Sequence, residues 1–281
     1  MTAALALPWP FEREFMQLAL VAGLVVGACA PLLGAFLVQQ RLSLLGDGLG
    51  HVAFAGVGAG LLVGVWPLWT ALAAAVAGAV LVQRLRRAGR AGGDLALALI
   101  FYSGIAAGVV LLGLAGSLDA NLFGYLFGSI LTVTPSDTRL VLVLGAVVVA
   151  AMAVCGRALF AIVVDEESAR VAGIPVDGLS SVLAALAALI VVAAMRVVGI
   201  LLVAALMVLP VATAQVVARS FRTTLVWAVT VGTLSVVVGL TASRLWALAP
   251  GGAIVLVAAA TFAVASLVTG RRHRVALVDR G

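Results

Sequence analysis

Residues 16–38 of the chain form the continuous apolar run MQLALVAGLVVGACAPLLGAFLV, in which no side chain is charged. An α-helix needs about 20 apolar residues to cross the roughly 30 Å hydrocarbon core of a bilayer. Similar runs recur to the far end of the chain and leave no stretch long enough for a soluble domain. With 64% hydrophobic residues, 10% charged residues and a mean hydropathy of +1.28, the composition indicates an all-α, polytopic transmembrane bundle.

The apolar runs predict eight or nine membrane spans. Only Arg196 separates the sixth run from the seventh, so one of that pair could be bent or partial, and eight spans remain the alternative. The whole chain, 1–281, is then a single transmembrane domain with a short N-terminal segment at 1–15 and a cytoplasmic tail at 271–281. The nine runs lie at 16–38, 47–65, 68–83, 95–115, 139–156, 179–195, 197–217, 224–242 and 251–269.

The arginines predict how these spans are oriented. The chain has 17 basic residues, all of them arginine, and a net charge of +6. If the tail lies in the cytoplasm, most arginines fall on the cytoplasmic side of a cell membrane, as the positive-inside rule expects. Membrane orientation thus explains the basic charge, and nothing points to nucleic acid. The four arginines expected outside are Arg13, Arg139, Arg196 and Arg244, and we expect Arg196 to extend to the outer interface.

Two further patterns concern the packing of the bundle. Glycines repeat at four-residue spacing, for example Gly23 with Gly27 and Gly104 with Gly108, which favours close helix contacts in a membrane. Residues 116–138, GSLDANLFGYLFGSILTVTPSDT, are too polar for a plain span and too apolar for a free loop. They predict a short re-entrant or interfacial helix on the outer side.

The stretch RLSLLGDGLGHVAFAGVGAG, residues 41–60, places Asp47 and His51 four residues apart. On a helix, both side chains then share one face. Carboxylate oxygen and imidazole nitrogen are ligands for Zn²⁺ and Mn²⁺, and the surrounding glycines are expected to leave that face open. Two alternatives remain at this point. Asp47 could cap the helix at the interface with His51 hydrogen-bonded in the bundle, or the pair could relay protons.

The stretch VVDEESARVAGIPVDG, residues 163–178, predicts a short cytoplasmic helix. Asp165 suits the N-cap, Glu166 and Glu167 favour the positive helix start, and Arg170 lies toward the other end. Gly173 suits the position after the last turn, and a proline follows it. Such a helix could dock into a partner, or it could be a solvated connector.

Four stretches together resemble the membrane permeases of zinc- and manganese-type ABC transporters. Gly48 and Gly50 stand where that family often has alanine and serine, and PGGAIVL before the last span has an extra glycine. Neither departure changes a ligand-type side chain. The four stretches are the Leu-x-Asp-x-x-x-His signature around Asp47 and His51, NLFGYLFGSIL, DEESARVAGIPV and RVVGILLVAALMVLPVATA, in that order.

The resemblance implies a role for both candidate sites. Such permeases act as homodimers, bind a cytoplasmic ATPase and receive metal from an extracellular binding protein. It implies that Asp47 and His51 contact a transported divalent ion, zinc, manganese or iron, and that no resident cofactor is needed. It also implies that the ATPase is coupled through the loop that contains Asp165, Glu166, Glu167, Ala169, Arg170 and Gly173.

The energy for transport must come from outside this chain. A P-loop requires a lysine that reaches the phosphates, and the chain contains no lysine. Either a partner hydrolyses ATP, or the protein is a proton-coupled secondary transporter or channel that uses Asp47 and His51. An intramembrane enzyme is disfavoured, since the chain has neither an H-E-x-x-H nor a G-x-S-x-G motif.

Overall fold

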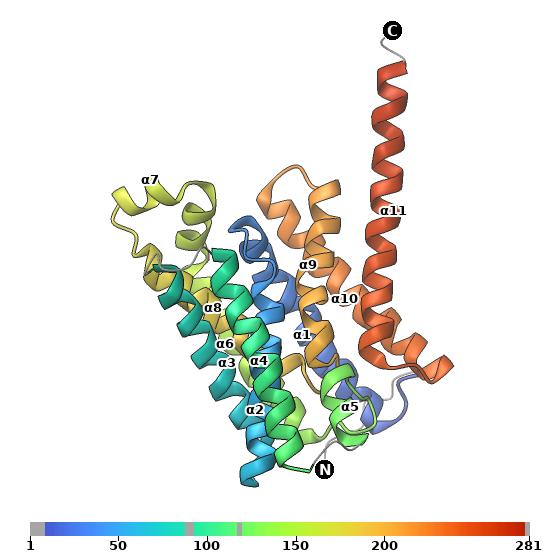
Figure 1. Ribbon diagram of the computed structural model, residues 1–281. Coiled ribbons are helices and arrows are strands. Elements are labelled where there is room, and N and C mark those ends of the chain that lie inside the picture. Colours follow the sequence, from blue (N-terminus) through green and yellow to red (C-terminus); the bar gives the residue numbers. More distant parts are fainter. Residues whose placement is uncertain (1–8, 88–92, 117–119, 279–281) are drawn as a thin grey trace.

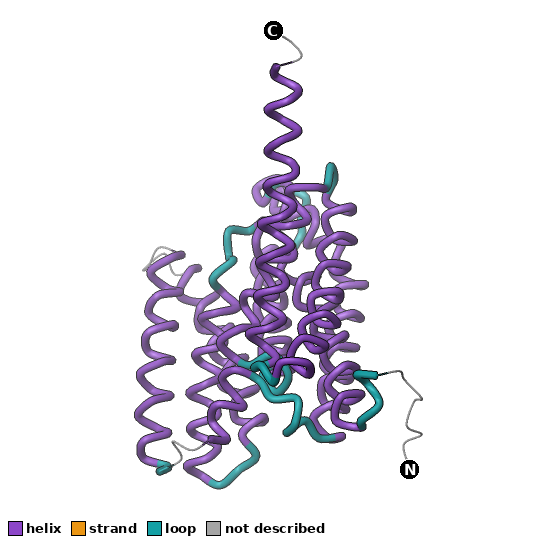
Figure 2. The backbone as a smooth tube through the Cα atoms, turned by 90° about the vertical axis from the view of Figure 1, so that its right-hand side faces the viewer, coloured by secondary structure: helices purple, strands orange, loops and turns teal. Residues whose placement is uncertain are grey.

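The computed structural model describes residues 9–87, 93–116 and 120–278 of the chain. These residues form α-helices joined by short connections, without a β-strand among them (Figure 2). Nine of the helices are long and apolar enough to cross a membrane. The all-α polytopic bundle is therefore confirmed, with the larger of the two expected span counts.

The helices extend further than the apolar runs that predict them. The fifth span begins at Pro135 because Thr134 and Asp137 form a reciprocal capping box there, and it continues to Val164. The last helix runs on through most of the expected tail. The bounds are α1 Glu14–Gln39, α2 Leu45–Val63, α3 Pro67–Arg87, α4 Gly93–Leu114, α5 Ala120–Phe127, α6 Pro135–Val164, α7 Glu166–Val171, α8 Val176–Ala194, α9 Ile200–Val217, α10 Phe221–Trp246 and α11 Pro250–Val278.

Two short helices mark the two ends of the bundle. Figure 1 shows α5 near the end where the N-terminus lies and α7 at the opposite end, while the C-terminal part of α11 projects beyond the other spans. The segment around α5 is the short helix expected within 116–138, and α7 is the short helix expected after Asp165. If the arginine-rich end lies in the cytoplasm, as the positive-inside rule predicts, α5 lies outside and α7 inside.

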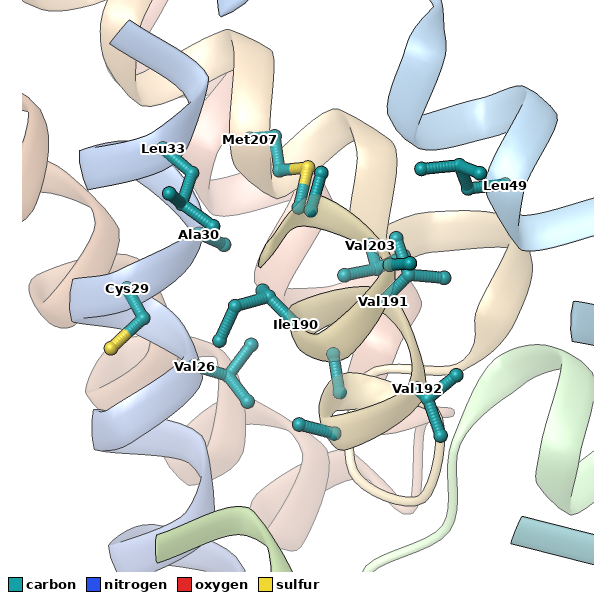
Figure 3. Packing of buried hydrophobic residues seen from close by; sticks show 14 of the residues in the cluster. Val26, Cys29, Ala30, Leu33, Leu49, Ile190, Val191, Val192, Val203 and Met207 are labelled. Carbon is teal, nitrogen blue, oxygen red and sulfur yellow. The ribbon is translucent and has the colours of Figure 1, made fainter. Parts of the chain in front are cut away.

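The centre of the bundle is the second half of α8. Every residue from Ile190 to Met195 is buried, so this helix is apolar and covered on all sides. Figure 3 shows Ile190 and Val191 between Val26 of α1 and Val203 of α9. The helix that carries the candidate metal ligands, α2, packs against α3, α4, α8 and α9 around this core.

The glycine repeats serve close packing, as expected. A β-carbon built at Gly27 of α1 would lie 3.1 Å from the carbonyl oxygen of Gly232 on α10, so the two backbones nearly touch. A β-carbon at Gly104 of α4 would lie 2.9 Å from the backbone of His51. In lipid the hydrophobic effect does not drive helices together, and small residues instead allow the close backbone contacts that hold them in place. Gly64 is different: it ends α2 with a φ of 72°.

Candidate metal-ion site and coupling helix

Asp47 and His51 lie on one face of α2, in its first and second turns. Their Oδ1 and Nε2 atoms are 3.8 Å apart. The His51 ring packs edge-on against Phe101 of α4, with 4.3 Å between the ring centroids. The His51 side chain is 11% exposed and that of Asp47 is 32% exposed, so the histidine is held in the seam between α2 and α4 and the carboxylate is the accessible group.

The spacing of the two atoms suits chelation of one ion. Two ligands at zinc-like bond lengths on a tetrahedral ion lie ~3.4 Å apart. The observed 3.8 Å is slightly wider than this, and it is also too long for a direct hydrogen bond. Asp47 and His51 therefore do not saturate each other, and a small side-chain movement would bring both onto one cation.

The helix-cap alternative for Asp47 has no support in the contacts. The N-cap of α2 is Leu44, which makes no side-chain cap hydrogen bond, and the described residues provide no hydrogen bond to the Asp47 carboxylate. Asp47 instead lines a cavity of about 250 Å³ between α2 and α4. Its neighbours there include Leu97, Phe101 and Tyr102. The carboxylate is thus available to a ligand rather than used by its own helix.

The glycines around the pair are less open than expected. A β-carbon at Gly46 would lie 2.9 Å from the sulfur of Met207, and one at Gly50 would lie 3.0 Å from the carbonyl oxygen of Ile200. Both glycines thus serve the contact of α2 with α9. Only Gly48 has open space beside it. Within the described parts of the chain, no third His, Cys, Asp or Glu joins the pair to form a larger ligand cluster.

The short helix α7 has the caps that its sequence predicts. The Asp165 carboxylate accepts hydrogen bonds from the backbone N–H groups of Glu167 and Ser168, at 3.0 and 3.2 Å, and from the Ser168 hydroxyl at 2.5 Å. The hydrogen bonds from Ser168 lower the pKa of Asp165 below its ordinary value. Gly173 follows the helix with a φ of 80°, a conformation that favours glycine.

Side chains of α7 divide into an anchored set and an exposed set. Ala169 is 4% exposed and packs on the bundle, whereas Val171 is 90% exposed. Arg170 forms ion pairs with Glu166 at 3.2 Å and with Asp177, at the start of α8, at 3.3 Å. The partner role of Asp177 could not be anticipated from the sequence, because it depends on how α7 folds back on α8.

Asp177 also connects this region to α3. Its carboxylate lies 3.7 Å from Nε of Arg87, the last residue of α3, and the same guanidinium donates to the Asp177 carbonyl and to the Ser181 hydroxyl. Arg170, Asp177 and Arg87 therefore form a charged chain from α7 through α8 to α3. Since α3 packs directly on α2, the short helix is linked to the helix of the candidate metal site.

The outer end of the bundle contains an ion pair that sequence reasoning missed. Arg196 lies at the outer end of the bundle, as expected, but its guanidinium is not free there: its Nε donates to Asp137 at 3.2 Å. The two side chains are 15% and 3% exposed, respectively. Arg196 also donates to the carbonyl of Thr132 and lies over the ring of Tyr125, 5.0 Å from its centroid. A carboxylate as buried as that of Asp137 needs a counter-charge, and Arg196 supplies it.

Comparison with known proteins identifies the family. Residues 12–269 match the model of the ABC 3 transport family. The manganese transport system membrane protein MntC of Listeria monocytogenes is 30% identical to this chain and covers 91% of it and 91% of its own length. The manganese import system permease protein ScaB of Streptococcus parasanguinis is 28% identical, with 94% of each chain covered.

A solved structure has the same fold. A chain of PsaBC from Streptococcus pneumoniae, determined in complex with Fab, matches with a TM-score of 0.82 and 30% identity, covering 91% of this chain and 92% of that chain. These findings confirm the resemblance that the four sequence stretches indicate. The chain belongs to the ABC 3 transport family and is a multi-pass permease of the cell membrane, the membrane-spanning and non-catalytic subunit of an ABC transporter.

Proposed function

We propose that this permease imports a divalent metal ion and that Asp47 and His51 contact the ion on its path. The observation that carries the proposal is the 3.8 Å separation of a carboxylate and an imidazole that no other described side chain saturates. Two relatives carry manganese transport in their names. One oxygen and one nitrogen donor suit Mn²⁺ and Zn²⁺, so manganese is the first ion to test and zinc the second.

A second copy of the chain would complete the ligand set. A structural zinc site takes four protein ligands, and one chain offers two at this place. Two copies related by a two-fold axis would offer two carboxylates and two imidazoles. In support, the cavity beside Asp47 is lined by two well exposed side chains, Leu44 and Tyr102, which a second copy could cover. We therefore infer a homodimer with a shared ion path.

A cytoplasmic ATPase and an extracellular binding protein complete the transporter. ABC permeases of this family work with both, and a chain without lysine has no P-loop of its own. We infer that α7 is the contact with the ATPase, because it is a capped helix with an exposed apolar residue, Val171, at the cytoplasmic end. The residues of the proposed coupling segment are Asp165, Glu166, Glu167, Ala169, Arg170 and Gly173.

The test of the ion path is metal uptake into vesicles that contain the permease and its ATPase, supplied with the binding protein. We expect Asp47→Asn and His51→Ala each to reduce manganese uptake to background while assembly with the ATPase persists. Gly48→Ala is the matched control, since it adds a methyl group beside the pair in open space and removes no ligand. Normal uptake by either ligand variant would refute the role of that residue. Uptake that needs a pH gradient instead of ATP would favour a proton-coupled transporter.

The test of the coupling segment is a pair of cysteine variants on α7. Val171→Cys is expected to crosslink to the ATPase, because Val171 points away from the bundle. Ala169→Cys is the matched control and should not crosslink, since Ala169 is buried against the permease itself. Absence of an ATPase crosslink at Val171→Cys, or crosslinks only between two permease chains, would remove α7 from the interface with the ATPase.

A further inference from the structure

A second cavity lies between α1, α6 and α10, on helices other than the two that form the Asp47 cavity. Its volume is about 320 Å³. The apolar part of its lining includes Leu32 and Phe36 of α1, Met152 of α6 and Leu225 of α10. Two arginines, Arg157 and Arg222, also line it. The cavity thus combines an apolar lining with two cationic residues, and it suits a ligand that has both an apolar and an anionic part.

The arginines lie at the depth of the cytoplasmic headgroups. On α6, Arg139 and Arg157 are separated by about 27 Å at 1.5 Å per residue, and on α10, Arg222 and Arg244 are separated by about 33 Å. No charged residue lies between the members of either pair. These lengths match the roughly 30 Å hydrocarbon core. Arg157 and Arg222 therefore mark its cytoplasmic boundary, while Met152 and Leu225 lie deeper in the hydrocarbon.

Both guanidinium groups are free to bind an anion. Among the described residues, neither Arg157 nor Arg222 forms an ion pair or a side-chain hydrogen bond, and both are exposed. The contrast is with Arg87 and Arg170 at the same end of the bundle, which are both paired with Asp177. The cytoplasmic leaflet supplies phosphate groups at this depth, and the planar guanidinium binds phosphate through two parallel hydrogen bonds.

We propose that this cavity binds an anionic phospholipid of the cytoplasmic leaflet. The phosphate contacts Arg157 and Arg222, and an acyl chain enters the apolar cavity beside Met152 and Leu225. The two positive charges select a negatively charged headgroup. The apolar cavity lies deeper in the membrane than the two arginines, just as the acyl chains of a lipid lie deeper than its headgroup. The site is independent of the metal path, because it shares no lining residue with the Asp47 cavity.

The test is native mass spectrometry of the full-length permease in detergent, titrated with phosphatidylglycerol. We expect the Arg157→Gln/Arg222→Gln variant to bind this lipid on the order of 10- to 30-fold more weakly than the wild type. The matched control is Arg139→Gln/Arg244→Gln, which removes the same charge from the same two helices at the outer boundary and should bind normally. Arg157→Lys/Arg222→Lys should bind with an affinity between those of the wild type and the glutamine variant, because it keeps both charges and loses the paired guanidinium hydrogen bonds.

A second variant tests the cavity without changing any charge. Gly156 lines the cavity, and a β-carbon built there meets no atom within 4 Å. Gly156→Leu should fill the cavity, leave the fold intact and weaken binding of phosphatidylglycerol by a similar factor. Gly113→Leu on α4 is its control, because Gly113 also has open space but lines none of the described cavities.

Several results would overturn the proposal. Equal affinity for phosphatidylcholine would mean that the negative headgroup is not selected, and displacement of phosphatidylglycerol by millimolar inorganic phosphate would mean that a free anion is the ligand. Unchanged binding in Gly156→Leu would place the lipid on the surface instead of in the cavity. A change of oligomeric state in the double glutamine variant, with lipid binding intact, would make the cavity an interface between protein chains.

Discussion

One carboxylate and one guanidinium connect three separate segments at the outer end of the bundle. Asp137 caps the start of α6 and binds Arg196, which lies in the turn between α8 and α9. Arg196 in turn holds the segment that follows α5, through the carbonyl of Thr132 and through a hydrogen bond from the Ser129 N–H to its own carbonyl. The pair thus fixes the outer helix α5 to the central helix α8.

Removing one partner of this pair should be costly. We expect Arg196→Leu to lower the free energy of unfolding by ~3–5 kcal/mol, because it leaves the Asp137 carboxylate buried without a counter-charge. Asp137→Asn should also destabilise, and the double variant should lose less than the sum of the two single variants. The measurement is denaturant unfolding in detergent micelles as a double-mutant cycle. Arg244→Leu is the control, and strictly additive losses would contradict the coupling.

Local contacts could be predicted from the sequence, and distant pairings could not. The caps of α7 at Asp165 and Gly173 follow from the chemistry of a few consecutive residues. The proximity of Asp47 and His51 follows from helical spacing alone. The contact between Arg196 and Asp137 joins residues 59 positions apart and depends on packing that no local pattern encodes. The same reason explains why Asp177 and Arg87 were not anticipated.

At the scale of the element, α7 has no flexible linker before it. Asp165 is both the C-cap of α6 and the N-cap of α7, so the short helix follows the span directly. The ion pairs of Arg170 and Arg87 with Asp177 attach it to α8 and α3. A displacement of α7 would therefore move α6, α8 and α3 together, and α3 packs against α2, the helix that carries Asp47 and His51.

The cap of α7 should be insensitive to pH across the physiological range. Hydrogen bonds lower the pKa of Asp165 in the folded protein, so its contribution to stability is complete above the ordinary Asp pKa of ~3.9. That contribution is lost only as the pH falls through the lowered folded value. We expect constant hydrogen-exchange protection of the Glu167 and Ser168 amides from about pH 8 to about pH 5, a range that lies above both values.

Two substitutions make this test specific. Asp165→Ala should lose the protection of both amides throughout the same pH range, because the acceptor is absent. Asp165→Asn should retain it, since asparagine is an equally good N-cap. Loss of protection in the wild type between pH 7 and pH 5 would show that a group other than Asp165 controls the start of α7.

The existence of each span was predictable, but its ends were less so. Hydropathy reports the part of a helix that lies in lipid, which is why 139–156 was found within α6 and 68–83 within α3. The remaining turns depend on polar groups such as the capping box of Thr134 and on ion pairs such as that of Arg87. These turns lie in the headgroup region or in water, where apolar composition is not required.

At the scale of the whole molecule, the glycine pattern predicted that helices pack closely, but it did not predict which helix contacts which. Gly27 meets α10 and Gly104 meets α2, and neither neighbour can be chosen from spacing alone, because every span offers an apolar surface to lipid and to protein alike. The arrangement around α8 therefore emerges only from the three-dimensional packing (Figure 3). The two ends of the bundle, by contrast, are distinguished by arginine content, which the sequence already displays.

The orientation of the bundle gives the last prediction. The arginine distribution and the positions of α5 and α7 place residue 131 outside the cell and residue 171 inside. We expect a membrane-impermeant maleimide to label Leu131→Cys but not Val171→Cys in intact cells that express the permease without its partners. Both residues are well exposed, so accessibility of the side chain itself does not limit the reaction. Cys29 and Cys155 are first replaced by alanine. In inverted membrane vesicles the labelling should reverse, and labelling of Val171→Cys in intact cells would place α7 outside, where a cytoplasmic ATPase has no access to it.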